Sequence, residues 1–221
     1  SGVITKIDTD KKMVALTLDA CGSANDNDGY DSKLIDFLLE KDIPATLFIN
    51  SRWIDNHKET FKKLASKSLF TIANHGSRHL PLSVNGNSIY DIKGNGNVEE
   101  VVDEVAINQE KIEDLTGEKP DYFRSGTAYY DEIVVNIVND LGMKVIGYDI
   151  LGDAGATFTK KEVEKALLNV NRGSIILAHM NRPQSETAEG IIAAVSKLKK
   201  KGFQFAKLEE YNNQLTGQSK K

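Results

Sequence analysis

The sequence is poor in cysteine, has no excess of basic residues and contains no long apolar run. Only one of its 221 residues is cysteine, Cys21, so an intrachain disulfide is excluded. The net charge of −4 argues against nucleic acid as the partner, because phosphate binding depends on clustered Lys and Arg. No stretch approaches the ~20 apolar residues of a membrane span, and no signal peptide is recognisable. The chain begins with Ser1 and Gly2 rather than Met, so a missing leader is uninformative.

Length and hydrophobic pattern predict one α/β domain over residues 1–221. The chain is 40% hydrophobic, and single α/β barrels commonly span ~200–250 residues. Short apolar runs rich in β-branched and aromatic residues alternate with amphipathic segments of helix length, which is typical of a parallel α/β fold. Strands are expected at residues 13–19, 45–50, 69–74, 122–124, 144–148, 174–179 and 203–206. Helices are expected around residues 34–38 and at residues 98–115, 132–141, 159–169 with Thr159 as N-cap, and 186–200. The run 84–97 is rich in Gly and Asn and predicts a surface loop, long enough to act as a lid.

Two histidines four residues apart follow the strand expected at residues 69–74. His75 and His79 can converge on one divalent ion if the backbone turns, and neutral imidazole is the commonest protein ligand for zinc. Taken alone, the spacing fits two histidines on a surface turn equally well. The position directly after a strand, where a parallel sheet presents its ligands, makes a metal site the leading hypothesis.

Further ionisable groups stand where predicted strands end: Asp19, Arg124, Asp149, Asp153 and His179. Each has an ordinary explanation taken singly, such as a capping carboxylate, a surface ion pair or a histidine satisfied in the core. The carboxyl ends of parallel strands lie on one rim, so these side chains would face a common cleft although they are far apart in sequence. The joint pattern therefore favours a catalytic site over independent structural roles.

These segments carry a resemblance to a known family. Residues 17–19, 75–79, 123–126, 148–153 and 177–179 stand in the order and rough spacing of five motifs of the polysaccharide deacetylases. That family is also called the NodB homology domain, or carbohydrate esterase family 4, and the match covers roughly residues 14–208. The resemblance implies a distorted, incomplete (β/α) barrel. It also implies metal-dependent removal of acetyl groups from a glycan such as peptidoglycan, chitin or xylan, in an extracellular or cell-envelope location.

The resemblance also implies a role for each residue of the cleft. A divalent metal, zinc above all, on His75 and His79 would bind the attacking water and the acetyl oxygen. Asp19 resembles the base that takes a proton from that water. His179 resembles the acid that protonates the leaving nitrogen, a step that an amide substrate needs.

Two further residues resemble groups that orient the base and the acid. Arg124 resembles the arginine of the third motif, which orients the base. Asp153 resembles the aspartate that hydrogen-bonds the acid histidine and raises its pKa, with Asp149 as the competing choice. A backbone N–H near Thr127 completes the oxyanion hole by analogy.

The chain departs from the family pattern at two places. Ala20 stands where the family has a second aspartate that ligates the metal. We favour Asp19 contacting the metal while it keeps some role in proton transfer. Other groups or a water could fill the position, and the side chains in reach are Cys21, Asp26 and Asp28. A Cys21 thiolate suits zinc, although an ordinary buried cysteine is the commoner outcome.

The second departure lies in the third motif, where Gly126 and Thr127 replace a proline and an aromatic residue. Tyr129 or Tyr130 could supply the missing cleft wall, and Trp53 could stack on a sugar, although a lone Trp after a strand is more often packing. Together the departures leave two functions open. The first is an active deacetylase, and the alternative is a catalytically impaired, glycan-binding pseudoenzyme of the same fold.

Overall fold

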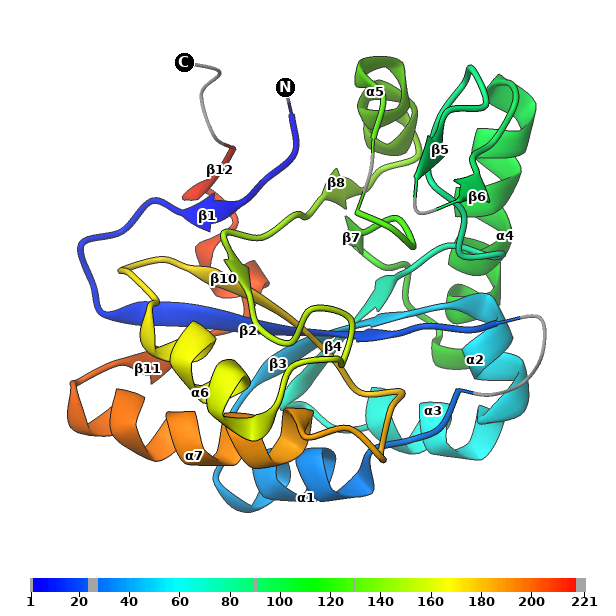
Figure 1. Cartoon of the computed structure of the whole chain (residues 1–221). Helices are drawn as coiled ribbons and strands as arrows, with labels where there is room; N and C mark the ends of the chain where they lie inside the picture. The colour runs from blue at the N-terminus through cyan, green and yellow to red at the C-terminus, as the bar shows by residue number, and fades with distance from the viewer. Residues whose placement is uncertain (1, 24–27, 90, 129, 218–221) are drawn as a thin grey trace.

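The centre of the molecule is a curled parallel sheet. The computed structural model describes residues 2–23, 28–89, 91–128 and 130–217. Eight strands in this part of the chain form the sheet in the order β8-β7-β4-β3-β2-β10-β9, with β11 paired to β2. Their bounds are β2 (Met13–Ala20), β3 (Ala45–Ile49), β4 (Phe70–Asn74), β7 (Tyr122–Phe123), β8 (Lys144–Val145), β9 (Ile150–Leu151), β10 (Ile175–His179) and β11 (Gln204–Phe205). The sheet curls into a half-barrel, which confirms the predicted distorted, incomplete (β/α) barrel (Figure 1).

Helices cover the outside of the sheet (Figure 1). They are α1 (Ser32–Glu40), α2 (Ser51–Asn56), α3 (Lys58–Ala65), α4 (Val98–Thr116), α5 (Glu132–Asp140), α6 (Lys160–Leu168) and α7 (Thr187–Lys200). Strand residues alternate between the two faces of the sheet, so every second side chain of β2 contacts the helices. Leu16, Leu18 and Ala20 accordingly belong to the core cluster that includes α1 and α7. Ala15 belongs to a separate cluster inside the curl.

Short elements complete the described chain. Strand β1 (Lys6–Ile7) pairs with β12 (Leu215–Thr216), which brings the two ends of the chain together beside the barrel (Figure 1). A short helix, η1 (Leu208–Tyr211), precedes β12. Among the helices of the described residues, we find none with the length and hydropathy to cross a membrane.

Most predicted elements are confirmed, and Thr159 caps α6 through a capping box with Glu162. The strand expected at residues 144–148 ends at Val145, so the prediction is wrong for its second half. The chain leaves the sheet there, because Gly147 donates its N–H to the carbonyl of Ile4. It returns as the separate strand β9, which we did not predict. Helices α2 and α3 were also not predicted.

The run at residues 84–97 is only partly a loop. It contains an antiparallel hairpin of β5 (Ser88–Ile89) and β6 (Ile92–Lys93). Two-residue strands are too short for a hydrophobic alternation to reveal them in the sequence. Ile92 of this hairpin lines the pocket described next, so the segment does border the cleft.

Candidate active site

The carboxyl ends of strands β2, β10, β4 and β7 bring predicted side chains to one cleft. Asp19 lies in β2 and pairs in register with His179 at the end of β10. His75 directly follows β4, and Arg124 directly follows β7. Because these strands are parallel, their carboxyl ends lie on one rim. A pocket of about 520 Å³ opens on this rim, and Asp19 and His179 line it.

Asp19 and Arg124 form a buried ion pair beside this pocket. Arg124 donates from Nη1 to Oδ1 of Asp19 at 2.8 Å. Its other nitrogens donate to the carbonyls of Ile146 and Gly147 at 3.0 and 2.9 Å, so the guanidinium is fixed at three points. Burial alone would raise the pKa of Asp19, but the charges of His75 and Arg124 outweigh it and lower the pKa. Asp19 is therefore an oriented carboxylate, with its second oxygen 3.5 Å from Nε2 of His75.

The two histidines meet as predicted. Their ring centroids lie 4.9 Å apart, with the planes at 78°. His75 is fully buried and donates from Nδ1 to the carbonyl of Arg124 at 2.9 Å, which places the lone pair of a neutral, metal-binding ring on Nε2. Among the described residues, no group hydrogen-bonds the buried Nε2 of His79. Both Nε2 atoms are thus available to a cation.

The turn between the histidines is held by Glu104 of α4, a residue that we did not identify from the sequence. Glu104 is buried and accepts hydrogen bonds from the backbone N–H groups of Arg78 and Leu80. Burial raises the pKa of Glu104, and these hydrogen bonds oppose the rise. His79 stands in the left-handed region at φ 63°, a conformation that a non-glycine residue keeps only where its surroundings impose it.

A sequence signal for Glu104 does exist. Val101, Val105 and Ile112 form the buried face of α4, and both Glu104 and Asn108 share that face. Buried polar groups in a helix need hydrogen-bond partners, so their placement there indicates a structural task. Asn108 donates from Nδ2 to the carbonyl of Ile49 at 2.8 Å and to Oδ1 of Asn74 at 2.9 Å.

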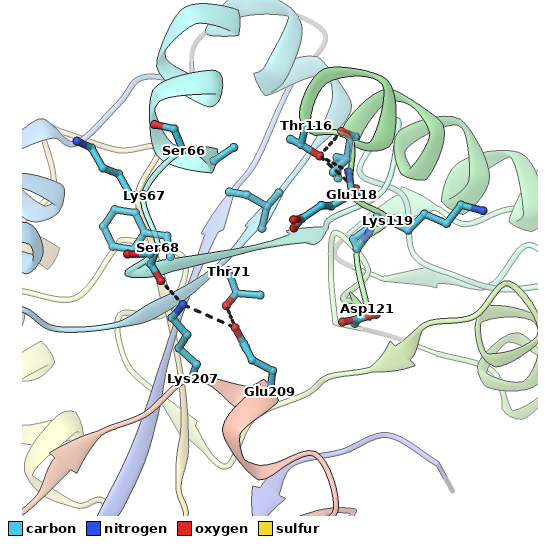
Figure 2. A pocket seen from close by; sticks show the side chains of 15 residues that line it. Ser66, Lys67, Ser68, Thr71, Thr116, Glu118, Lys119, Asp121, Lys207 and Glu209 are labelled. Atoms are coloured by element: carbon cyan, nitrogen blue, oxygen red, sulfur yellow. Dashed lines mark hydrogen bonds and ion pairs between the residues drawn. The ribbon is translucent and has the colours of Figure 1, made fainter.

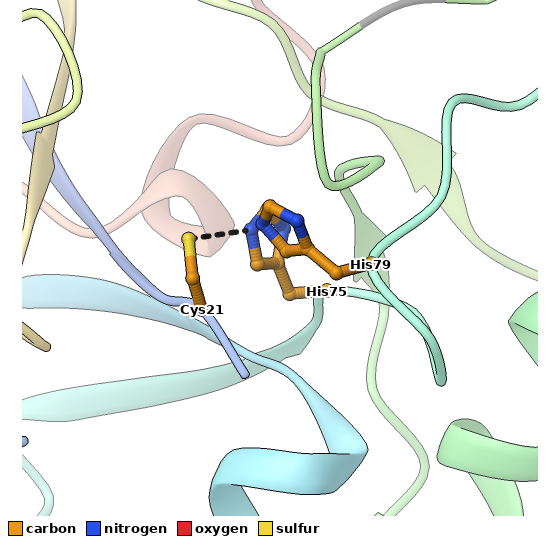
Figure 3. Close-up of side chains that lie close together, drawn as sticks. All are labelled: Cys21, His75 and His79. Atoms are coloured by element: carbon orange, nitrogen blue, oxygen red, sulfur yellow. Dashed lines mark hydrogen bonds between the residues drawn. The ribbon is translucent and has the colours of Figure 1, made fainter. Parts of the chain in front are cut away.

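Cys21 lies next to the two histidines. Its Sγ is 3.6 Å from Nε2 of His75, and one ligand atom from each of Cys21, His75 and His79 lies within 4.8 Å of the others (Figure 3). Burial alone would raise the pKa of the Cys21 thiol, but the charge of His79 and hydrogen bonds with His179 and His75 lower it well below its ordinary value. Two imidazoles and a thiolate form a donor set that fits zinc.

His179 faces this group from β10, supported by Asp153. Nδ1 of His179 donates to Oδ1 of Asp153 at 2.8 Å, and the other oxygen accepts from the backbone N–H of His179 and from the hydroxyl of Thr187. Burial alone would lower the pKa of His179, but its interactions with Asp153 and, after that, with Cys21 outweigh burial, and the pKa is raised well above its ordinary value. Asp149, the competing choice, instead accepts from Ser174 and from the N–H of Ile175.

Several other predicted residues lie elsewhere. Asp28 accepts hydrogen bonds from Ser23 and Asn181, so its oxygens are engaged away from the histidines. Trp53 is fully buried and donates to the carbonyl of Gly29, which makes it a core residue and not a sugar platform. Asp26 and Tyr129 fall outside the described residues.

The third-motif segment forms a wall of the pocket. Gly126 and Thr127 both line it. A Cβ at position 126 would lie 2.5 Å from the carbonyl oxygen of His79, so the glycine permits a close approach to that loop. Tyr130 does not line the pocket; its hydroxyl accepts from the N–H of Ser125 behind the wall.

A second pocket of about 450 Å³ lies at the opposite, amino-terminal end of the strands (Figure 2). In this pocket Lys207 contacts both the carbonyl of Ser68 and the carboxylate of Glu209. Parallel α/β barrels carry their active sites at the carboxyl ends of the strands. The candidate active site is therefore the cleft that holds Asp19 and His179.

Comparison with known proteins identifies the family. Residues 6–146 match the family model described as polysaccharide deacetylase. The chain belongs to the polysaccharide deacetylase family, as the five motifs indicated. It is 25% identical over 208 residues to the uncharacterized protein YlxY of Bacillus subtilis, a match that covers 94% of this chain and 59% of that protein. The chain thus spans less than two thirds of that relative's length.

Solved structures support the same fold. The chain is similar to a family 4 carbohydrate esterase pseudoenzyme from Bacillus anthracis, with a TM-score of 0.77 and 22% identity over 96% of this chain and 69% of the other. It is also similar to a peptidoglycan N-acetylglucosamine deacetylase, with a TM-score of 0.78 and 19% identity over 95% of this chain and 92% of the other. The fold is therefore shared with a peptidoglycan N-acetylglucosamine deacetylase and with a pseudoenzyme.

Proposed function

We propose that the protein is a metal-dependent hydrolase that removes acetyl groups from an N-acetylated or O-acetylated polysaccharide such as peptidoglycan, chitin or xylan. The proposal rests on two ionisable side chains, Asp19 and His179, that line one pocket and are each held by a partner. Asp19 is held by Arg124, and His179 is held by Asp153. A module that only binds glycan has no need of both an oriented carboxylate and a supported imidazole.

The residues divide the chemistry between them. His75 and His79 would hold a divalent metal, zinc above all, which would supply Lewis-acid polarisation and lower the pKa of the attacking water. Asp19, with one oxygen fixed by Arg124, takes the proton from the attacking water through its free oxygen. His179 hands a proton from Nε2 to the leaving nitrogen or oxygen, while Asp153 holds Nδ1. Backbone N–H groups near Thr127 stabilise the charge that develops on the acetyl oxygen.

In this proposal residues 1–221 form one catalytic domain, and its substrate is an acetylated glycan. Such polymers belong to cell walls and extracellular matrices, so we propose an extracellular or cell-envelope location. The similarity to a peptidoglycan N-acetylglucosamine deacetylase supports this choice of substrate class.

The second candidate is a catalytically impaired protein that binds glycan without turnover. Ala20 in place of the family's second aspartate favours it, as does the similarity to a pseudoenzyme. The retained pairs at Asp19 and His179 favour the hydrolase.

Metal analysis combined with an acetate-release assay separates the two. Protein purified without chelator should contain one divalent ion, and should release acetate from N-acetylglucosamine oligomers or acetylated xylan. The double variant His75→Ala, His79→Ala should lose both the ion and the activity, whereas Asp19→Asn should lose activity while it keeps the fold. Stoichiometric metal with no acetate release on any of these glycans would favour the pseudoenzyme. Full metal content in the double histidine variant would refute the site.

A further inference from the structure

We propose that the Cys21 thiolate is the third protein ligand of the metal held by His75 and His79, in the place of the absent carboxylate. The inference rests on the proposed metal-dependent function and goes further, because it assigns a Cys-His-His site in which Asp19 is left free to act as a base. It replaces our expectation from the sequence that Asp19 itself would contact the metal.

The distance between the ligand atoms of Cys21 and His75 fits a tetrahedral ion. With Zn–S of about 2.3 Å and Zn–N of about 2.05 Å, tetrahedral angles place sulfur and nitrogen about 3.5 Å apart. The observed distance from Sγ of Cys21 to Nε2 of His75 is 3.6 Å, and the set with His79 lies within 4.8 Å (Figure 3). Three protein ligands leave the fourth position open, as in catalytic zinc sites.

The direction of the chain explains why Cys21 and not residue 20 reaches the histidines. Successive strand residues point to opposite faces, so Asp19 faces the cleft and Ala20 faces the helices. Ala20 is fully buried in the cluster that also contains Trp53. Cys21, two residues after Asp19, returns to the side of the cleft and lines the pocket.

The next residue fixes this arrangement. A Cβ on Gly22 would lie 2.6 Å from Oδ1 of Asn50 and 2.7 Å from the backbone nitrogen of Trp53. The glycine therefore lets the chain pass close against the start of α2, and this contact anchors the residue that follows Cys21. The backbone next to Cys21 is therefore held by packing against Asn50 and Trp53.

The remaining ligand atoms point to the same ion. The buried Nε2 of His79 has no hydrogen-bond partner in the described part of the chain, which leaves a polar atom that a metal would satisfy. His75 is oriented by its hydrogen bond to the carbonyl of Arg124, as ligating histidines are. Oδ1 of Asp19 is engaged by Arg124, and Oδ2, which lies 3.5 Å from Nε2 of His75, is the oxygen that remains for proton transfer.

A thiolate changes which metals the site prefers. It carries the same single negative charge as the carboxylate it replaces, so the charge of the site is preserved. Sulfur is a softer donor than oxygen, which favours zinc and cobalt over magnesium, manganese and calcium. The chain thus has a coherent metal site of altered chemistry, although it lacks the family's second aspartate.

Cobalt substitution tests the ligand directly. Metal-free protein is loaded with one equivalent of Co²⁺, and its absorption spectrum is recorded. We expect a thiolate-to-cobalt charge-transfer band in the near ultraviolet for the wild type. Cys21→Asp should bind the ion without the band. Cys21→Ser should lack the band and bind zinc more weakly by at least about tenfold, measured by competition with a chromophoric chelator.

A second measurement needs no variant. Because Cys21 is the only cysteine in the chain, the rate of alkylation by iodoacetamide reports on this one thiol. Zinc should slow the reaction and EDTA should restore it, so the inference stays testable even if Cys21→Ser does not fold. As a control, wild type and Cys21→Ser should unfold at similar temperatures when both contain excess chelator.

The two experiments distinguish failure of the Cys21 inference from failure of the proposed function. Stoichiometric Co²⁺ without the charge-transfer band, together with an alkylation rate that zinc does not change, would show that another group fills the third position. The inference would then be lost while the proposed function stands. Wild-type protein that binds no metal would defeat the proposed function itself. Metal-free protein that is active until Cys21 is alkylated would overturn both, because the thiol would then be a nucleophile.

Discussion

Arg124 donates a 2.8 Å hydrogen bond to Asp19 across 105 positions of sequence, and both side chains are almost completely buried. The pair ties β2 to the end of β7, two strands that are not neighbours in the sheet. It also leaves the carboxylate with one fixed and one free oxygen. An interaction placed in this way can be tested through both stability and activity.

We expect Arg124→Met to destabilise the protein by about 3–5 kcal/mol, because it leaves the Asp19 carboxylate buried without its partner. The double variant Arg124→Met, Asp19→Asn should recover part of this loss, since the uncompensated charge is gone. Urea unfolding of both variants measures the difference. The exposed Arg172 is the control, and Arg172→Met should change stability by less than about 0.5 kcal/mol. Equal losses in the single and double variants would contradict a charge-based role.

His179→Ala should reduce turnover on N-acetyl substrates by about 10²–10⁴-fold, the usual contribution of a general acid. O-acetyl esters should lose less, because an alkoxide leaves more readily than an amide nitrogen without prior protonation. Steady-state kinetics on acetylated chitin oligomers and acetylated xylan provide the comparison, with metal content measured in parallel. Equal losses on both substrates, or loss of metal, would assign His179 another task.

The third prediction concerns pH. The Asp153 carboxylate stabilises the imidazolium form of His179 and so raises its pKa. A general acid is active in its protonated form, so activity falls as pH rises through that pKa. Asp153→Asn removes the charge, lowers the pKa and should move the alkaline limb of the kcat profile to lower pH. Asp149→Asn is the matched control and should leave the limb in place, because Asp149 contacts Ser174 and Ile175 instead. If Asp153→Asn left the alkaline limb of the pH profile unchanged, the pairing of Asp153 with His179 would have no role in catalysis.

The fourth prediction concerns Glu104 as a positioning residue. Glu104→Gln puts an amide group against backbone N–H donors of the turn that carries His79. We expect metal affinity to fall by about 10–100-fold, as for other groups that orient ligands indirectly. Glu110→Gln, at an exposed position of the same helix, is the control. Chelator competition gives both affinities, and unchanged affinity in Glu104→Gln would show that the turn holds His79 without it.

The alternation of strands and helices was predictable from hydrophobic periodicity, and so was the rim on which the site lies. Asp19, His75 and His179 each stand at the end of an apolar run, and parallel strands bring such ends together whatever the details of packing. The five motifs added the family. Short strands such as β9 were missed, because two residues carry no measurable period.

Only the tertiary structure decided which side chains meet. Periodicity assigns a residue to a face, but hydrogen bonds and metal ligands depend on positions within about an ångström, which are set by loop paths and by packing between distant segments. The sequence left Asp149 and Asp153 as alternatives, and the path after β8 placed Asp153 against His179. The sequence also left several candidates for the third metal ligand. In the structure, the direction of β2 and the close contact at Gly22 bring Cys21 to the two histidines.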